Sequence, residues 1–217
     1  MNKEFPTKSL PLYSLLPLLG VFEEPLFHWL LQQEQGLPEG SLVSLTQTPW
    51  GLIQHLSCLM ESCLPYLETA YEEVLPSVWV AKGVRIHGTA TLLGPLVLGE
   101  DVDIGQKVHL HGPLYLGKRV RIGQDVEIRS SVLCEGVRID AGTIVLDSIL
   151  GKDVVLEEQV TTLTRGETSI PLTVEYPSGV FHVTGCHRLG SYICPRTRVQ
   201  RGEKLKAGTI LLPSSGV

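Results

Sequence analysis

From Val80 to Leu133 the chain reads VAKGVR IHGTAT LLGPLV LGEDVD IGQKVH LHGPLY LGKRVR IGQDVE IRSSVL, nine consecutive hexads. The first residue of every hexad is apolar: Val80, Ile86, Leu92, Leu98, Ile104, Leu110, Leu116, Ile122 and Ile128. The fifth is apolar as well: Val84, Ala90, Leu96, Val102, Val108, Leu114, Val120, Val126 and Val132. In a chain with 43% hydrophobic residues, chance gives eighteen such matches on the order of once in 10^7 trials.

Six residues do not form a helical period, and glycines such as Gly99, Gly105 and Gly117 occupy turn positions between the apolar ones. Short strands that turn every six residues predict a solenoid of stacked triangular coils. The period shortens to five at two places, Val132 to Val137 and Ile149 to Val154, and we expect each deletion to fall at a corner. Apolar hexad positions continue to Val160 and return from Ile193 to Leu211.

Residues 1–76 differ from the hexads and predict a small helical region. Pro25 to Gln35 reads as one helix, with Pro at its first position and Gly36 past its end. A second helix is expected to begin with Thr48 as its cap, and Pro65 ends or kinks it. The region is interpreted as a cap on the solenoid, because open terminal coils expose strand edges. The alternative is a ligand or partner surface formed by Trp29, Trp50 and Tyr66.

The β-solenoid is expected to occupy residues 77–217, with an insertion at about 164–185. This insertion reads as a hairpin that turns at Pro177-Ser178-Gly179. Two interpretations stay open: a loop that covers an active site in a neighbouring subunit, or a loop that covers the core where the coil is interrupted.

Composition excludes several classes of protein. A net charge of -5 gives no reason to expect a nucleic-acid partner. Five cysteines without a Cys-x-x-Cys spacing indicate neither a disulfide framework nor a zinc site. The apolar stretch Ser14 to Phe22 is too short for a membrane span, and no signal-peptide cleavage site follows it. We expect a cytoplasmic protein.

The hexads resemble the left-handed parallel β-helix of hexapeptide acyltransferases. Ser148 to Val154 (SILGKDV), Thr184 to Gly190 (TGCHRLG) and Lys206 to Thr209 (KAGT) are similar to the β-helix domain of bacterial sugar-phosphate nucleotidyltransferases, including glucosamine-1-phosphate acetyltransferase. This resemblance covers residues 77–213, and the nucleotidyltransferase domain is missing. It implies a left-handed coil, a homotrimer, acetyl-CoA or another acyl-CoA as co-substrate, and an amino sugar, sugar phosphate or sugar nucleotide as ligand.

The family's acyl transfer needs a His base and backbone N–H groups that bind the oxyanion. Where the resemblance places that His, this chain has Asp140, Ala141 and Gly142. The candidate catalytic residues are therefore His109 and His111, which flank Leu110 and should point outward from one strand, together with His182 and Asp140. Asp140 is the candidate to orient the substrate amine. The alternative for His109 and His111 is two exposed side chains at a trimer seam.

A basic run near the C-terminus, with only Glu203 against it, favours a phosphorylated ligand such as coenzyme A. Its residues are Arg188, Arg196, Arg198, Arg201, Lys204 and Lys206. The alternative is an ordinary solvated face. His182 and His187 have the spacing of metal ligands in γ-class carbonic anhydrases, which share this fold, but no upstream His completes the set, and no metal is expected.

Two hypotheses of function follow. One is an acyl-CoA-dependent acyltransferase that acts on an amino sugar or sugar phosphate in sugar-nucleotide or cell-envelope biosynthesis, with a base other than the family His. The other is a non-catalytic trimeric binding or scaffold protein, which has lost that base and partners a nucleotidyltransferase. A carbonic anhydrase-like metal protein is a remote third.

Overall fold

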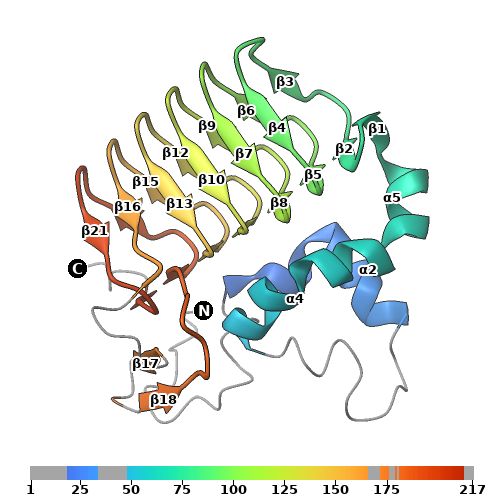
Figure 1. The fold of residues 1–217 in the computed structure, drawn as a ribbon. Coiled ribbons are helices and arrows are strands. Elements are labelled where there is room, and N and C mark those ends of the chain that lie inside the picture. Colours follow the sequence, from blue (N-terminus) through green and yellow to red (C-terminus); the bar gives the residue numbers. More distant parts are fainter. Residues whose placement is uncertain (1–18, 34–47, 166–171, 176–178, 180, 213–217) are drawn as a thin grey trace, which may run out of the picture.

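The computed structural model describes residues 19–33, 48–165, 172–175, 179 and 181–212. These residues form a mainly β protein built around a left-handed parallel β-solenoid, as the hexads and the family resemblance predict. Figure 1 shows the coils stacked in one row, with the helices along one side of the stack.

Three sheets form the faces of the solenoid. Sheet A consists of β1 (Glu72–Leu75), β2 (Val78–Val80), β5 (Leu96–Leu98), β8 (Leu114–Leu116), β11 (Val132–Leu133), β14 (Ile149–Leu150), β19 (Tyr192–Ile193) and β22 (Ile210–Leu211). Sheet B consists of β3 (Arg85–Ile86), β6 (Asp103–Ile104), β9 (Arg121–Ile122), β12 (Arg138–Ile139), β15 (Val155–Leu156) and β20 (Arg198–Val199). Sheet C consists of β4 (Thr91–Leu93), β7 (His109–His111), β10 (Glu127–Arg129), β13 (Ile144–Leu146), β16 (Thr161–Thr162) and β21 (Lys204–Leu205).

Both shortened repeats fall at the corner that leads from sheet C to sheet A. Leu96 pairs with Leu114, a step of 18 residues, whereas Tyr115 pairs with Val132, a step of 17. Between His111 and Tyr115 lie the three residues Gly112-Pro113-Leu114, whereas between their partners Arg129 and Val132 lie only the two residues Ser130-Ser131. The expectation that the coil continues through both deletions is confirmed.

Two hexad positions differ from the sequence pattern, one after each deletion. Val132 and Ile149 lie on the outer face of sheet A, while Leu133 and Leu150 point into the solenoid. The deletion moves Ser131 into the interior position that the pattern assigned to Val132, and Ser131 is fully buried. Sheet A tolerates this shift because both of its faces are covered, so its strands are apolar on both sides.

The helices pack on the outer face of sheet A. They are the 3-10 helix η2 (Val21–Glu23) and the α-helices α2 (Pro25–Gln33), α4 (Pro49–Ser62) and α5 (Leu64–Ala70). The Oγ1 atom of Thr48 caps α4 by accepting a hydrogen bond from the N–H of Gly51 at 3.1 Å, as predicted, and α5 begins around Pro65. Buried side chains of α2 and α4 share one cluster with Trp79, Val97, Tyr115, Val132, Ile149 and Tyr192 of sheet A.

At the terminal edge of sheet A, β1 pairs with β2 in the antiparallel direction. The division of the chain at residue 76 stays a prediction, because helices and coils share one hydrophobic cluster. The expected helix end at Gln35 and Gly36 lies outside the described residues.

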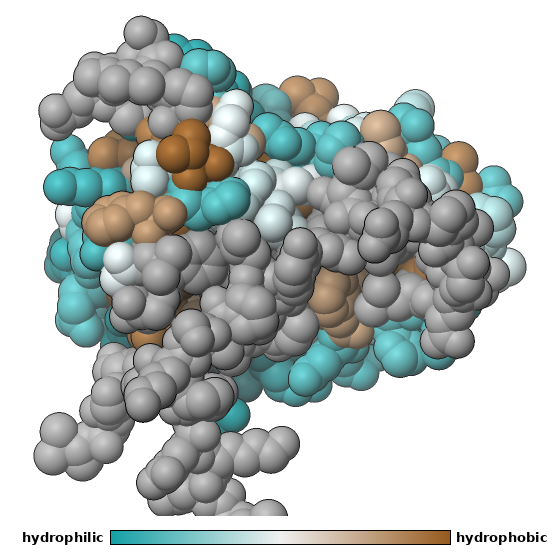
Figure 2. All heavy atoms as spheres, turned by 90° about the horizontal axis from the view of Figure 1, so that it is seen from below, coloured by the Kyte–Doolittle hydropathy of each residue, from teal (hydrophilic) through white to brown (hydrophobic). Residues whose placement is uncertain are grey.

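The insertion contains an antiparallel pair, β17 (Thr173–Glu175) and β18 (Phe181–Val183). Pro177 and Ser178 of its expected turn lie outside the described residues. In the described part of the chain, no helix has the length and apolarity needed to cross a bilayer. The face drawn in Figure 2 is mainly hydrophilic where described residues are visible, with small separate hydrophobic areas.

Candidate functional site

The outer face of sheet C brings the candidate His109 into line with Lys204. His109 pairs with Glu127 in β10, and the same ladder position passes through Ile144 and Thr161 to Lys204. His111 lies in the neighbouring row, with Arg129 and Leu146. Four strand steps separate β7 from β21, which corresponds to roughly 19 Å along the solenoid.

This face is open in the described structure. His109, Leu163, Lys204 and Lys206 are exposed, and His111 is half-buried. Neither lysine is in an ion pair with a described residue. Between the histidine end and the lysine end lie half-buried aliphatic side chains of β13 and the ion pair of Glu127 with Arg129. The face therefore offers imidazoles at one end, free ammonium groups at the other, and apolar surface between them.

Three of the remaining basic candidates lie beside carboxylates of the preceding coil, from the β13–β14 and β15–β16 loops. Arg188 pairs with Asp147 at 2.9 Å, Arg198 with Glu157 at 2.9 Å and Arg201 with Glu158 at 3.2 Å. Arg196 is exposed and occupies a turn with a φ of 61°. Glu203 is thus not the only opposing charge, since three of the six basic residues have carboxylate partners from the preceding coil.

Asp140 and His182 lie apart from the histidines of sheet C. Asp140 follows β12, where its Oδ1 atom accepts a hydrogen bond from Nε of Arg138 at 2.8 Å. The ring of His182 in β18 stacks on Trp50 of α4, with ring centroids 5.3 Å apart and an interplanar angle of 22°. This contact links the insertion to the helical region. The structure therefore does not assemble the four candidate catalytic residues into one site.

A buried carboxylate forms a second arrangement, between the helices and sheet A. Glu24 is 4% exposed and lies directly before α2. Its Oε2 atom accepts a hydrogen bond from the hydroxyl of Tyr115 at 3.1 Å, and its Oε1 atom accepts one from the N–H of Glu135 at 2.6 Å. Burial raises the pKa of Glu24 from 4.5 to about 7, against the opposing effect of these hydrogen bonds.

A cavity of about 140 Å³ adjoins this carboxylate, and its lining residues are Gly20, Glu23, Glu24, Pro25, Lys118, Glu135 and Lys152. Lys152 and Arg119 hold Glu135 in ion pairs of 2.8 and 2.6 Å and keep the pKa of Glu135 below its usual value. Burial has the opposite effect on the nearby thiol of Cys134, whose pKa it raises. Among the carboxylates that the structure describes, Glu24 has a pKa raised to about 7, so its carboxyl is partly protonated near neutral pH.

Sequence reasoning missed Glu24 and Tyr115. The available signal was the continuous apolar character of the strands Leu96–Leu98 and Leu114–Leu116, since a strand covered on one face alternates apolar and polar residues. Local sequence could not predict the contact between Glu24 and Tyr115, because 91 residues separate them.

No three His, Cys, Asp or Glu side chains of the described residues are grouped closely enough to hold a metal ion. His187 is exposed, and His182 is occupied by its stacking contact with Trp50. All five cysteines are unbridged. The carbonic anhydrase alternative therefore finds no support in the described part of the chain.

Comparison with known proteins adds no family assignment to this geometry, because no protein-family model matches the chain and no curated protein is significantly similar to it.

Proposed function

We propose that this protein is an acyl-CoA-dependent acyltransferase whose substrates bind along the outer face of sheet C. One observation carries the proposal: His109 and Lys204 occupy the same ladder position on an open face, four strand steps apart. The fold and the family resemblance of the hexads favour an acyl-CoA donor. The acceptor class is an amino sugar or sugar phosphate, in sugar-nucleotide or cell-envelope biosynthesis.

The arrangement suits coenzyme A because its chemistry changes along its length. Its phosphates require cations, which Lys204 and Lys206 supply. Its pantetheine arm would lie over Ile144 and Leu146 of β13 and contact them through its carbon atoms. The thioester then lies toward β7, beside the two imidazoles.

The reaction follows from these positions. The amine nitrogen of the acceptor forms a bond to the thioester carbonyl carbon, and His109 takes the proton that the amine loses. The carbon–sulfur bond breaks, and the imidazolium returns a proton to the departing thiolate. His111 lies two residues away on the same face and is the second candidate base.

The site needs a second wall, because sheet C is exposed in a single chain. We propose that the wall comes from neighbouring copies in a homotrimer. Sheet A is already covered by α2 and α4, so sheets B and C are the solenoid faces left for such contact. Leu93 and Leu163, 51% and 41% exposed on sheet C, are the apolar side chains that this contact would cover.

A second candidate function is a trimeric scaffold without turnover, in which the partner is a nucleotidyltransferase. The observation that favours it is the ion pair between Asp140 and Arg138, which occupies the coil position where the family resemblance places a His base. This scaffold binds a sugar nucleotide or acyl-CoA without transferring the acyl group.

Calorimetric titration with acetyl-CoA tests the proposal. We expect saturable binding, which a Lys204→Ala/Lys206→Ala variant weakens at least tenfold, while Lys82→Ala, another exposed lysine, leaves it unchanged. Mass spectrometry of glucosamine-1-phosphate incubated with acetyl-CoA then detects transfer, which His109→Ala removes. Absence of acetyl-CoA binding overturns the transferase, and binding without transfer to any of a panel of amino sugars favours the scaffold.

A further inference from the structure

The outer face of sheet B carries a row of arginines. One residue of each strand points outward, and the ladder joins these residues in the order Arg85, Asp103, Arg121, Arg138, Val155 and Arg198. The inward residues of the same strands, such as Ile104 and Ile122, belong to the core of the solenoid. Sheet B therefore presents guanidinium groups from most of its strands.

Three of these arginines have a carboxylate partner within the chain. The pairs are Arg85 with Asp103 at 2.9 Å, Arg138 with Asp140 at 2.8 Å and Arg198 with Glu157 at 2.9 Å. Arg121 is exposed and makes no ion pair with a described residue. Its ladder neighbour on one side is Arg138, and like charges on adjacent strands repel each other. Arg121 is therefore the arginine of this face that is best suited to a carboxylate from another chain.

Sheet C carries a carboxylate at the same level of the solenoid. Among the described strand residues of sheet C, Glu127 is the one with a negative charge. Its Oε1 atom accepts a hydrogen bond from Arg129, and no described residue donates one to its Oε2 atom. The strands β9 and β10, which hold Arg121 and Glu127, follow each other in one coil. Their levels along the solenoid therefore differ by about a third of the strand spacing, roughly 1.6 Å.

The covering of sheet A limits how three copies can form a ring. Because helices lie on sheet A, a ring around an axis parallel to the solenoid directs the corner between sheets B and C toward that axis. Sheet B of each copy then meets sheet C of the next, in a heterologous contact that closes after three copies. Rotation about this axis produces no shift along it, so residues at the same level meet. Arg121 of one copy then lies opposite Glu127 of the next.

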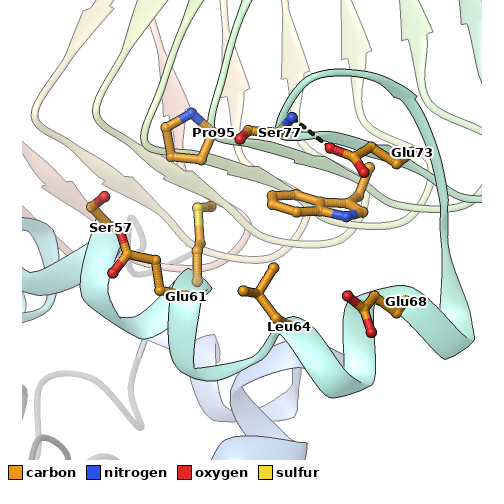
Figure 3. Close-up of a pocket in the computed structure, with 9 residues that line it drawn as sticks. Ser57, Glu61, Leu64, Glu68, Glu73, Ser77 and Pro95 are labelled. Atoms are coloured by element: carbon orange, nitrogen blue, oxygen red, sulfur yellow. Dashed lines mark hydrogen bonds between the residues drawn. The ribbon is translucent and has the colours of Figure 1, made fainter.

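The other charges of the two faces are compatible with this register. Arg138 lies level with β13, which is aliphatic, and Arg198, which lies level with Lys204, already has Glu157 as its partner. A cluster of three carboxylates without a described ion-pair partner, Glu61, Glu68 and Glu73, lines a cavity of about 330 Å³ between α4, α5 and the first strands (Figure 3). This cluster lies on the side of sheet A, outside the contact between sheets B and C.

We propose that sheet B of one copy packs on sheet C of the next and that Arg121 of the partner subunit pairs with Glu127 across this contact. The inference rests on the homotrimer of the proposed function, but not on acyl transfer. Glu127 is the ladder partner of His109, so Arg121 of the partner subunit lies about one strand step from the candidate base. The partner thereby contributes a residue to the site and closes the open face beside His109.

Reversal of the two charges tests this contact through the mass of the full chain, measured by multi-angle light scattering over a range of concentrations. Arg121→Glu and Glu127→Arg each bring like charges together, and we expect each to raise the dissociation constant of the trimer at least about tenfold. The variant Arg121→Glu/Glu127→Arg restores an opposite pair and should restore the trimer. Arg85→Glu/Glu127→Arg has the same net charge but the wrong level, so it is the matched control and should stay dissociated.

The contact is refuted by a wild-type monomer, by single reversals that leave the trimer unchanged, or by a control variant that assembles as well as the level-matched one. Calorimetric titration of the wild type with acetyl-CoA separates this result from the transferase. Rescue of the trimer by the level-matched variant, together with no acetyl-CoA binding, would leave the contact standing and overturn only the transferase.

Discussion

The hydroxyl of Tyr115 donates a hydrogen bond of 3.1 Å to the carboxylate of Glu24, and this bond joins the start of α2 to the outer face of sheet A. The same carboxylate accepts the backbone N–H of Glu135 from the next coil. The ring of Tyr115 also contacts Phe27 of α2, with centroids 5.2 Å apart. A polar and an apolar contact therefore fix the helices on the solenoid at one point.

The raised pKa of Glu24 predicts a dependence of stability on pH. Its pKa is about 7 in the folded chain and near 4.5 when exposed, so the folded state binds more protons between these values. The protonated Glu24 carboxyl therefore contributes its full stabilisation below about pH 4.5. This contribution to the free energy of unfolding, about 3 kcal/mol in total, is lost as the pH rises through 7. Urea unfolding of wild type and Glu24→Gln between pH 5 and 8 measures it.

The Glu24→Gln variant should lose this slope and be more stable than the wild type at pH 8. Glu23→Gln, the exposed neighbour, is the control and should retain the wild-type slope. Parallel curves for wild type and Glu24→Gln would contradict the raised pKa.

The backbone of Gly117 lies close to the carboxylate of Glu24. A Cβ atom there would lie 2.5 Å from Oε2 of Glu24 and 2.7 Å from the backbone nitrogen of Glu135. Because the backbone cannot retreat easily, we expect Gly117→Ala to lower the free energy of unfolding by about 1–3 kcal/mol. Gly88→Ala is the matched control, since a Cβ atom at Gly88 meets nothing within 4 Å. Thermal unfolding that is equally affected in both variants would argue against this packing.

Three buried serines form a ladder at the corner from sheet C to sheet A. The Oγ atom of Ser131 accepts the N–H of Ser148 at 3.1 Å, and the Oγ atom of Ser148 accepts the N–H of Ser191 at 2.9 Å. The hydroxyl of Ser191 itself has no partner among the described residues. Ser148→Ala leaves a buried N–H unpaired and should cost about 1–3 kcal/mol.

Ser191→Ala removes a hydroxyl that makes no hydrogen bond, so it should leave the stability unchanged or raise it slightly. Chemical denaturation of both variants measures the difference. A cost at Ser191 as large as that at Ser148 would contradict this ladder of hydrogen bonds.

The proposed homotrimer predicts a particle of three times the 23.8 kDa of the chain. Leu93→Glu/Leu163→Glu places charges on the exposed apolar positions of sheet C and should shift the mass toward the monomer. Leu75→Glu, with an exposed leucine of β1, is the control. Multi-angle light scattering checks both, and a wild-type monomer at micromolar concentration would refute the assembly.

The hexads alone specified most of the solenoid, because each interior position repeats within one coil and depends only on local spacing. Leu110, Leu116 and Ile128 are buried where the pattern places them. The pattern was wrong at Val132, which the one-residue deletion moves to the outer face of sheet A. Spacing by six cannot distinguish the two faces of a strand that is apolar on both.

Less of the candidate site than of the fold could be predicted from the sequence. The outward direction of His109 and His111 followed from alternation along a strand, and the structure places both on the outer face of sheet C. The alignment of His109 with Lys204 required the register of strands that the insertion separates in sequence. The carboxylates beside Arg188 and Arg198 likewise come from an earlier coil.

The sequence by itself determined the repeating coil, its apolar interior and the helices around Pro25 and Pro49, since these follow from periods of six and about 3.6 residues and from local capping. Only the tertiary structure decided where the helices pack, and hence that Glu24 meets Tyr115 and that His182 stacks on Trp50. These contacts join segments far apart in the chain. Their geometry is set by the covering of sheet A, which no local pattern encodes.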